Sequence, residues 1–205
     1  MINNGGKKQM AKVGRTEKWF MNRPKHNIKA ANKIERLLEY VDYKEKQKFL
    51  EIGCGNGAAC KHIAKKYNLN VTGMDVDPEQ IQNAIDDIEK NQNIQFFEGD
   101  STNLKFSDNE YDIVYSSGVL HHINNWKRVL EEINRVLKPK GYYIFSDLAY
   151  SSFTARVFKN IAKNLGIYTI DNIINFMEDN NFEILHQEKN EGLFFKTHSL
   201  IFRKS

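Results

Sequence analysis

A glycine-rich turn follows the first strongly apolar run of the sequence. Gly53, Gly55 and Gly57 are separated by single residues and come directly after the run Phe49–Ile52. Glycines at this spacing adopt backbone angles that other residues avoid, and they let the chain approach a ligand closely. A helix that begins near Ala59 would offer free N–H groups and a positive dipole end to a carboxylate or a phosphate. The turn therefore predicts a site for a ligand with an anionic group.

This turn by itself fits two classes of cofactor site. Gly53, Gly55 and Ala58 also match the G-x-G-x-x-G/A pattern of dinucleotide-binding domains. Asp75 lies about 20 residues further on, at the end of a second β-rich run, where both classes place an acid that binds ribose hydroxyls. The glycines and Asp75 alone therefore do not decide between a nicotinamide dinucleotide and another cofactor that contains ribose.

Two further acids favour a ligand that carries an ammonium group. Glu51 lies two residues before the first glycine, and Asp100 follows the third β-rich run. Glu51 would repel a pyrophosphate, whereas it would stabilise the ammonium of an amino acid. S-adenosylmethionine has such an ammonium, a carboxylate for the loop, a ribose diol for Asp75 and an adenine amino group that can donate to Asp100. The acids therefore favour S-adenosylmethionine over NAD.

A second group of polar residues is predicted at the same edge of the sheet. The segment Ser116–His122 follows the fourth predicted strand, and Asp147 ends the fifth. Ligands of doubly wound sheets bind at the carboxyl ends of the strands. His121 or His122 is therefore a candidate general base, with Asp147 as a further polar candidate. The alternative is a structural role, because a His pair at the start of a helix often packs against the core or caps the helix. A metal site made of Asp147, His121 and Asp100 is not expected, because no ligand pair has a recognisable metal spacing.

The order of elements follows from two alternating signals. Short β-rich runs alternate with stretches in which apolar residues recur at helical spacing, which indicates a parallel sheet with crossover helices. The predicted strands are Lys48–Ile52, Asn70–Asp75, Ile94–Glu98, Tyr111–Ser116 and Gly141–Asp147. The predicted helices are Ile28–Val41 before the first strand, Ile81–Ile88, and Trp126–Leu137, the last closed by Pro139 and Gly141.

The pattern changes after the fifth strand. Phe153–Leu165 and Ile170–Met177 fit two amphipathic helices, the first ended by Gly166 and the second capped by Thr169. Phe182–Gln187 and Leu193–Phe202 fit two strands joined by a polar turn around Asn190 and Gly192. The predicted fold is α/β: a doubly wound, mostly parallel, Rossmann-like sheet of seven strands with an antiparallel C-terminal strand and helices on both faces.

Five segments in this order resemble the motifs of class I S-adenosylmethionine-dependent methyltransferases, in particular the small-molecule enzymes with a methyltransferase domain of type 11. They are Glu51–Gly57, Gly73–Asp75, Glu98–Asp100, Tyr111–Val114 and Arg135–Gly141. The resemblance covers roughly Lys29 to the C-terminus. The Asn/Asp-Pro-Pro-Phe/Tyr turn of enzymes that methylate amino groups of DNA bases is absent after the fourth strand, which disfavours that reaction.

The resemblance implies S-adenosylmethionine as the cofactor and S-adenosylhomocysteine as the product. The residues that it places around the cofactor are Glu51 at the methionine ammonium; Gly53, Cys54, Gly55 and Gly57 along the methionyl and ribose groups; Asp75 on the ribose hydroxyls; Val76 on the adenine face; Asp100 at adenine N6; Ser101 beside the adenine; and Ser116 at the methionine end.

Two aromatic-rich segments are expected to cover the acceptor. Trp19–Met21 and Tyr150–Tyr168 flank the elements that carry the cofactor motifs and would form a lid, which is how the family's small-molecule enzymes are arranged. The alternative is that the apolar residues of the second segment, such as Phe153 and Leu165, are ordinary core contacts. The expected organisation is a basic arm at 1–27 and a cofactor-binding domain at 28–205, with a lid-like insertion at 147–169.

Charge and composition bound the function further. Residues 1–36 hold ten Lys and Arg against two Glu, so a local net charge of +8 leaves −4 for the remainder. Such an arm binds an acidic partner or is a solvated tail. The length of 205 residues fits one domain, no apolar stretch approaches the roughly 20 residues of a membrane span, and two cysteines are too few for a disulfide framework.

We therefore expect a cytoplasmic enzyme that methylates a small organic acceptor and does not engage a membrane. Methylation of a protein or an RNA is the alternative enzymatic function, and a non-catalytic module that binds S-adenosylmethionine is the alternative outside catalysis. The acceptor and the oligomeric state are left open by the sequence.

Overall fold

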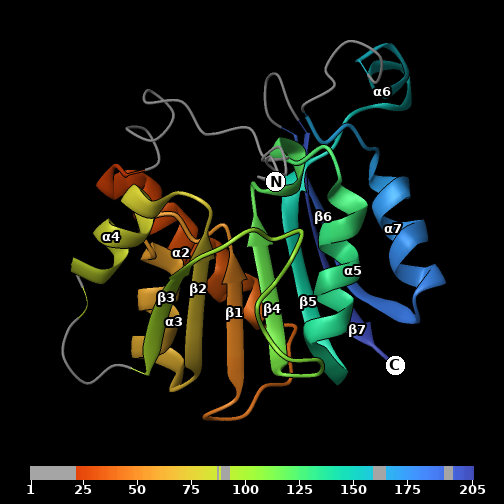
Figure 1. The fold of residues 1–205 in the computed structure, drawn as a ribbon. Coiled ribbons are helices and arrows are strands. Elements are labelled where there is room, and N and C mark those ends of the chain that lie inside the picture. The colour runs from red at the N-terminus through yellow and green to blue at the C-terminus, as the bar shows by residue number, and fades with distance from the viewer. Residues whose placement is uncertain (1–21, 87, 89–92, 159–164, 192–195) are drawn as a thin grey trace, which may run out of the picture.

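The computed structural model describes residues 22–86, 88, 93–158, 165–191 and 196–205 (Figure 1). These residues form a seven-stranded sheet in the order β3-β2-β1-β4-β5-β7-β6. The strands are β1 (Lys48–Ile52), β2 (Asn70–Asp75), β3 (Ile94–Glu98), β4 (Tyr111–Ser117), β5 (Leu137–Leu148), β6 (Phe182–Glu191) and β7 (Lys196–Lys204). The first five strands are parallel, and β7 runs antiparallel to both β5 and β6. The predicted fold class is confirmed.

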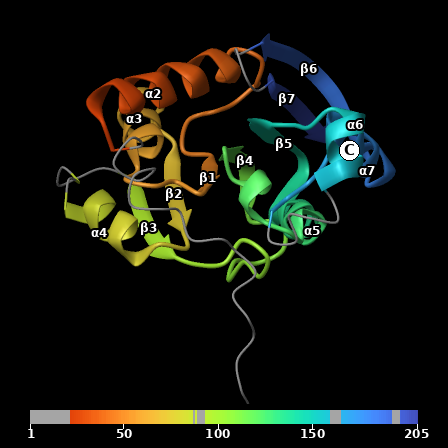
Figure 2. The ribbon, with the colours of Figure 1, turned by 90° about the horizontal axis from the view of Figure 1, so that it is seen from above.

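Helices cover both faces of this sheet (Figure 2). They are α2 (Pro24–Leu38), α3 (Ala58–Tyr67), α4 (Pro78–Asp86), the short 3-10 helix η1 (Leu120–His122), α5 (Trp126–Val136), α6 (Ser152–Phe158) and α7 (Ile170–Asp179). Apolar residues of α2, α3 and α4 share one core, and those of α5 and α7 share the other. None of the helices among the described residues combines the length and apolar content of a membrane span.

The central strands are buried on both faces, which explains their continuous apolar character. In β1, Phe49 packs into the core under α2 and α3, whereas Leu50 and Ile52 pack into the core under α5. A strand of this kind needs apolar residues at successive positions, in contrast to the alternation of a half-exposed strand. The predicted bounds of β1, β2 and β3 are confirmed.

The predicted helix caps agree with the structure around α7. The Thr169 hydroxyl accepts a hydrogen bond from the Asn172 backbone N–H at 3.3 Å, and the Asn172 side chain accepts one from the Thr169 N–H at 3.0 Å. This reciprocal capping box satisfies two amide groups that would otherwise lack partners at the helix start.

The structure differs from the sequence prediction at β5 and in the C-terminal hairpin. β5 begins at Leu137, so Pro139 lies inside the strand, at a register irregularity between β4 and β5 where a missing N–H is tolerated. The prediction of a turn at Asn190 is wrong, because Asn190 pairs with Thr197 in the β6–β7 ladder. Polar residues are tolerated there because β6 is an edge strand. Gly192 lies outside the described residues.

The C-terminal hairpin also contacts the first described helix. The ring of Tyr40, just after α2, stacks on His186 of β6 with centroids 3.6 Å apart. One turn earlier, Arg36 forms an ion pair with Glu188 at 2.7 Å. The first described helix and the C-terminal hairpin are thus joined to each other. The order of strands reverses between β1 and β4, which is where open α/β sheets bind ligands.

Candidate functional site

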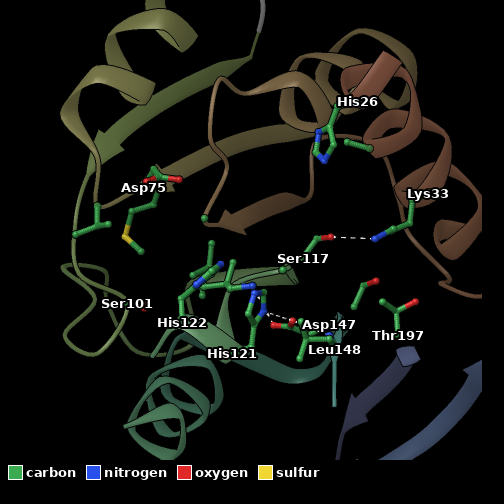
Figure 3. Close-up of a pocket in the computed structure, with 18 of the residues that line it drawn as sticks. His26, Lys33, Asp75, Ser101, Ser117, His121, His122, Asp147, Leu148 and Thr197 are labelled. Atoms are coloured by element: carbon green, nitrogen blue, oxygen red, sulfur yellow. Dashed lines mark hydrogen bonds and ion pairs between the residues drawn. The ribbon is translucent and has the colours of Figure 1, made fainter. Parts of the chain in front are cut away.

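A cavity of about 410 Å³ lies at this reversal (Figure 3). Its walls come from α2, from the carboxyl ends of β1, β2, β4 and β5, from the loop after β3 and from η1. The residues of the predicted site that line it are Gly53, Asp75, Val76, Ser101, His121, His122 and Asp147. Residues from both ends of the predicted site therefore meet at one cavity.

The glycine turn adopts backbone angles that explain its composition. Gly53, Gly55 and Gly57 have φ of +71°, +53° and +74°. A Cβ atom on Gly53 would lie 2.3 Å from Cγ2 of Val119. A residue with a side chain would therefore be strained at this positive φ and would also clash with Val119. The turn leads directly into α3, which begins at Ala58 and supplies the predicted helix N-terminus.

Asp75 connects the end of β2 to this turn. One carboxylate oxygen accepts a hydrogen bond from the Gly55 N–H at 2.9 Å, and the other accepts one from the Asp77 N–H at 2.9 Å. Burial raises the pKa of Asp75 above its usual range. A carboxylate has about four lone-pair sites, so two remain to accept hydroxyl hydrogens from a ligand in the cavity.

The loop after β3 places one unsatisfied polar atom at the cavity. The Ser101 hydroxyl is buried and has no hydrogen-bond partner among the described residues, although Ser101 lines the cavity. A buried hydroxyl without a partner is costly, and a polar ligand would satisfy it. Asp100 is outside the lining, and its carboxylate accepts two hydrogen bonds from Thr102 at 2.8 Å each. The structure therefore brings Ser101, but not Asp100, to the cavity wall.

Four other predicted residues lie behind the turn or within its backbone. Glu51 is 5% exposed and accepts a hydrogen bond from the Cys60 thiol of α3 at 2.9 Å. Burial raises the pKa of Glu51 to about 7. Cys54 is also buried, and its thiol donates to the Gly55 carbonyl at 3.6 Å. None of Glu51, Cys54 and Gly57 belongs to the lining, and neither does Gly55, so the predicted roles of these four residues at the cofactor stay predictions.

Ser116 points away from the cavity, and Ser117 takes its place. The Ser116 hydroxyl forms a hydrogen bond with the Tyr143 hydroxyl at 2.8 Å inside the core, whereas Ser117 lines the cavity. Successive residues of a strand face opposite sides, so only one of the two can reach the ligand. The alternation along β4, read together with the strand's predicted end, was the signal that could have identified Ser117.

His121 and Asp147 form the best-defined polar contact of the site (Figure 3). His121 Nδ1 lies 2.5 Å from one oxygen of the buried Asp147 carboxylate. Asp147 also accepts backbone N–H donors from Val119 at 2.9 Å, Leu120 at 2.8 Å and Leu148 at 2.7 Å. Three backbone N–H donors and the contact with His121 therefore fix the carboxylate, and the carboxylate in turn fixes the orientation of the imidazole. The ring of His122 lies 3.9 Å from that of His121, centroid to centroid.

Helix α2 contributes a basic wall that the sequence prediction missed. His26, Lys29 and Lys33 all line the cavity. Lys33 Nζ donates to the Ser117 hydroxyl at 3.3 Å, and burial lowers the pKa of the Lys33 ammonium. The three residues recur at helical spacing on one face, which was a usable signal. In the sequence, Lys29 and Lys33 enter only the net charge of residues 1–36, and His26 lies in the predicted arm 1–27.

The predicted lid is only partly described. Gly166 donates its N–H to the His121 carbonyl at 3.0 Å, and Tyr150 donates to the Tyr168 carbonyl at 3.0 Å. Tyr168 is fully buried, whereas Phe153 of α6 is 79% exposed. The segment Trp19–Met21 lies outside the described residues, so closure over the acceptor stays a prediction. Among the described residues, no group of three or more His, Cys, Asp or Glu could hold a metal ion.

Comparisons with known proteins agree with this architecture. The family described as "Methyltransferase domain" matches residues 50–145. Sterol 24-C-methyltransferase ERG6A of Gibberella zeae is 30% identical over 165 residues, 74% of this chain and 43% of that protein. The glycine/sarcosine/dimethylglycine N-methyltransferase of Actinopolyspora halophila is 31% identical over 131 residues, 60% of this chain and 23% of that protein. The aligned parts thus span less than half the length of these curated relatives.

A solved structure gives the same fold over nearly the whole chain. It is the complex between the Haloferax volcanii Trm112 methyltransferase activator and a methyltransferase, which matches with a TM-score of 0.74 and 17% identity over 92% of this chain and 94% of that chain. The matched family segment contains the glycine turn, Asp75, Ser101 and the two histidines of the cavity, His121 and His122. Residues 50–145 therefore form a methyltransferase domain of class I, the family whose cofactor is S-adenosylmethionine.

Proposed function

We propose that this protein transfers the methyl group of S-adenosylmethionine to a small organic acceptor bound in the cavity between the glycine turn and α2. The observation that carries the proposal is the shared cavity, which joins Asp75 and Ser101 on one wall to His121 and Asp147 on another (Figure 3). The relatives are named for sterol and for glycine and sarcosine methylation, which supports a small acceptor.

The cofactor half of the cavity has groups that suit S-adenosylmethionine. Asp75 has lone pairs left for the ribose hydroxyls. The Ser101 hydroxyl, which has no hydrogen-bond partner in the part of the chain that the structure describes, suits a polar edge of the adenine. Val76 offers an apolar side chain to the adenine face. The Gly53–Gly57 turn leaves room for the backbone to approach the methionyl group. We assign these residues to the cofactor.

Methyl transfer from a sulfonium depends more on the position of the acceptor atom than on proton transfer. The bound cofactor supplies a methyl group on a sulfonium, and the thioether that leaves needs neither a proton nor a metal ion. The protein's task is to hold the acceptor atom in line with the methyl carbon and to exclude water. Apolar side chains of Ile52, Val119 and Leu148 in the cavity wall favour exclusion of water.

His121 is the candidate general base for an acceptor that must lose a proton. If Nδ1–H donates to Asp147, the lone pair of the ring is on Nε2, which can then accept a proton from the acceptor. Asp147 would hold this tautomer and stabilise the charged ring. His122 is the neighbouring alternative for this role.

The test measures binding and transfer separately. Calorimetry should detect S-adenosylhomocysteine with micromolar affinity, about −8 kcal/mol. S-adenosylmethionine with a labelled methyl group, incubated with the protein and a cell extract, should label the small-metabolite fraction. Label in the RNA or protein fraction would contradict the small acceptor, and binding without any label would favour a non-catalytic module. Binding of NAD in place of S-adenosylhomocysteine would overturn the cofactor assignment.

A further inference from the structure

Lys33 has an unusual position for a lysine on a surface helix. It projects from α2 toward the cavity, on the side where Ser117, Leu148 and Thr197 lie, and across the cavity from Asp75 and Ser101 (Figure 3). Most of its surroundings are protein, and this burial lowers the pKa of the ammonium. The site described so far gives this residue no role in binding the cofactor.

The ammonium of Lys33 is poorly satisfied by its neighbours. It has three donor hydrogens, and its hydrogen bond among the described residues is a long one, 3.3 Å, to the neutral hydroxyl of Ser117. Among the described residues Lys33 forms no ion pair. Burying a charge without a counter-ion is unfavourable, so an anion bound near Lys33 would stabilise its ammonium.

The two carboxylates that attract Lys33 are both engaged elsewhere. Asp147 raises the pKa of Lys33 through its charge, but its two oxygens already accept from His121 and from three backbone N–H groups. Glu188 acts in the same direction, but it forms an ion pair with Arg36 at 2.7 Å. Neither carboxylate lies within ion-pair distance of Lys33, so an anion that enters the cavity meets an ammonium that has no carboxylate counter-ion among the described residues.

The other ionisable residues of α2 that line the cavity are also basic. Lys29 and His26 line the cavity one and two turns before Lys33 on α2. Ala30 of the same helix and Leu148 at the end of β5 provide apolar surface beside them. A molecule with an apolar body and one anionic group would match this combination of charge and apolar contact.

We propose that the Lys33 ammonium binds a carboxylate or phosphate group of the methyl acceptor and thereby orients the acceptor toward His121. This inference rests on the proposed methyl transfer. The position of Lys33 across the cavity from Asp75 and Ser101 favours the acceptor, and not the carboxylate of the cofactor, as the source of the anion. Lys29 and the Ser117 hydroxyl assist by adding positive potential and a second donor.

The experiment uses simple anions as probes of the complex with S-adenosylhomocysteine. Calorimetry or NMR titration measures the affinity of benzoate and phenyl phosphate, with benzamide as the neutral analogue of benzoate. The variants are Lys33→Met, which keeps an unbranched side chain one atom shorter and without the charge, and Lys33→Arg, which keeps the charge. Lys25→Met is the matched control, because Lys25 is exposed on the same helix and does not line the cavity.

At least one anion should bind the wild type tenfold or more tightly than benzamide. Lys33→Met should lose this preference, Lys33→Arg should keep most of it, and Lys25→Met should behave as the wild type. The stronger of the two anions identifies the group as a carboxylate or a phosphate. Thermal unfolding of each variant establishes that it is folded, and Lys33→Met is expected to be at least as stable as the wild type, because it no longer buries an unpaired charge.

Equal binding of anions and benzamide, or a preference that survives in Lys33→Met, would overturn the inference. So would a tenfold loss of S-adenosylhomocysteine affinity in Lys33→Met, because the anion would then be the carboxylate of the cofactor. Failure of the wild type to bind S-adenosylhomocysteine would instead overturn the proposed function itself. The two failures are therefore distinguishable.

Discussion

His121 Nδ1 and the Asp147 carboxylate, which are separated by 26 residues in the chain, lie 2.5 Å apart at the ends of neighbouring strands. The contact is specified by the sheet, because β4 and β5 are parallel neighbours whose carboxyl ends coincide. The 3-10 turn that carries His121 is held against Asp147 by the N–H groups of Val119 and Leu120. Backbone and side chain thus fix the same imidazole.

His121→Gln should lower the rate of methyl transfer by about 10²–10⁴-fold if the acceptor must lose a proton, because that is the usual contribution of a general base. The affinity for S-adenosylhomocysteine should change by less than tenfold. Single-turnover rates and calorimetry on the same preparation measure the two effects, and His122→Gln is the control on the adjacent residue. A larger loss of rate in His122→Gln would transfer the role of base to His122.

Asp75→Ala should weaken S-adenosylhomocysteine binding by about 1–3 kcal/mol, the usual effect of losing a charged hydrogen-bond acceptor. The matched control is Asp77→Ala, because Asp77 lies in the same loop and accepts a hydrogen bond from the Glu79 N–H at 3.0 Å but does not line the cavity. Calorimetry should separate the two variants clearly. Equal losses of affinity would mean that the loop, and not the Asp75 carboxylate, is what the ligand needs.

Glu51 should make the free energy of unfolding depend on pH. Burial raises its pKa from 4.5 to about 7 in the folded protein, so the folded state holds this proton more tightly than the unfolded state. Stability contributed by the protonated Glu51 is therefore present at low pH and is lost as the pH rises from about 4.5 to about 7.

Glu51→Gln should remove this loss, which corresponds to about 3 kcal/mol at pH 8. Urea unfolding of both proteins between pH 5 and pH 8 measures it. Since Asp75 also has a raised pKa and contributes with the same sign, the difference between the two profiles, and not the wild-type profile alone, is the relevant quantity. Parallel profiles would show that Glu51 is ionised in the folded protein at both pH values.

Gly53→Ala and Gly118→Ala should differ in their cost although both glycines have positive φ, +71° and +67°. Both variants suffer the strain of a left-handed residue, about 1–2 kcal/mol. At Gly53 the new Cβ also meets Val119 Cγ2 at 2.3 Å, whereas at Gly118 its nearest neighbour is His121 Cε1 at 3.9 Å. Overpacking should add about 1–3 kcal/mol to the Gly53 variant, as measured by chemical unfolding. Equal costs would show that Val119 moves aside freely.

The features predicted best from the sequence are the bounds of the strands and the residues at their carboxyl ends. The bounds of β1, β2 and β3 were predicted to the residue, because each of these short β-rich runs is bounded at both ends by a polar residue or a turn signal. Burial on both faces explains the apolar run of β1, whereas β3 is an edge strand and is largely exposed. The boundary signals also placed Asp75 and Asp147 at strand ends, where both reach the cavity. The N-terminal start of β5 was missed, since Pro139 indicates a break although an irregular register accommodates it there.

What the sequence could not supply was the direction of individual side chains. The family resemblance places Glu51 and Ser116 at the ligand, and no sequence pattern indicates that Glu51 accepts a hydrogen bond from Cys60 of α3 or that Ser116 shares one with Tyr143 in the core. Lys33 was missed for the opposite reason. It looks like one more charge in a basic segment until the packing of α2 shows that this face borders the cavity.

The contact between α2 and the C-terminal hairpin has a consequence for how such a protein can diversify. The cofactor half of the cavity comes from one continuous stretch between Gly53 and Ser101, whereas the opposite wall combines α2 with Thr197 of β7. Tyr40 on His186 and Arg36 with Glu188 hold these outer elements to each other. On the proposed function, substitutions in α2 and in the C-terminal hairpin would therefore alter the wall assigned to the acceptor and leave Asp75 and Ser101 in place.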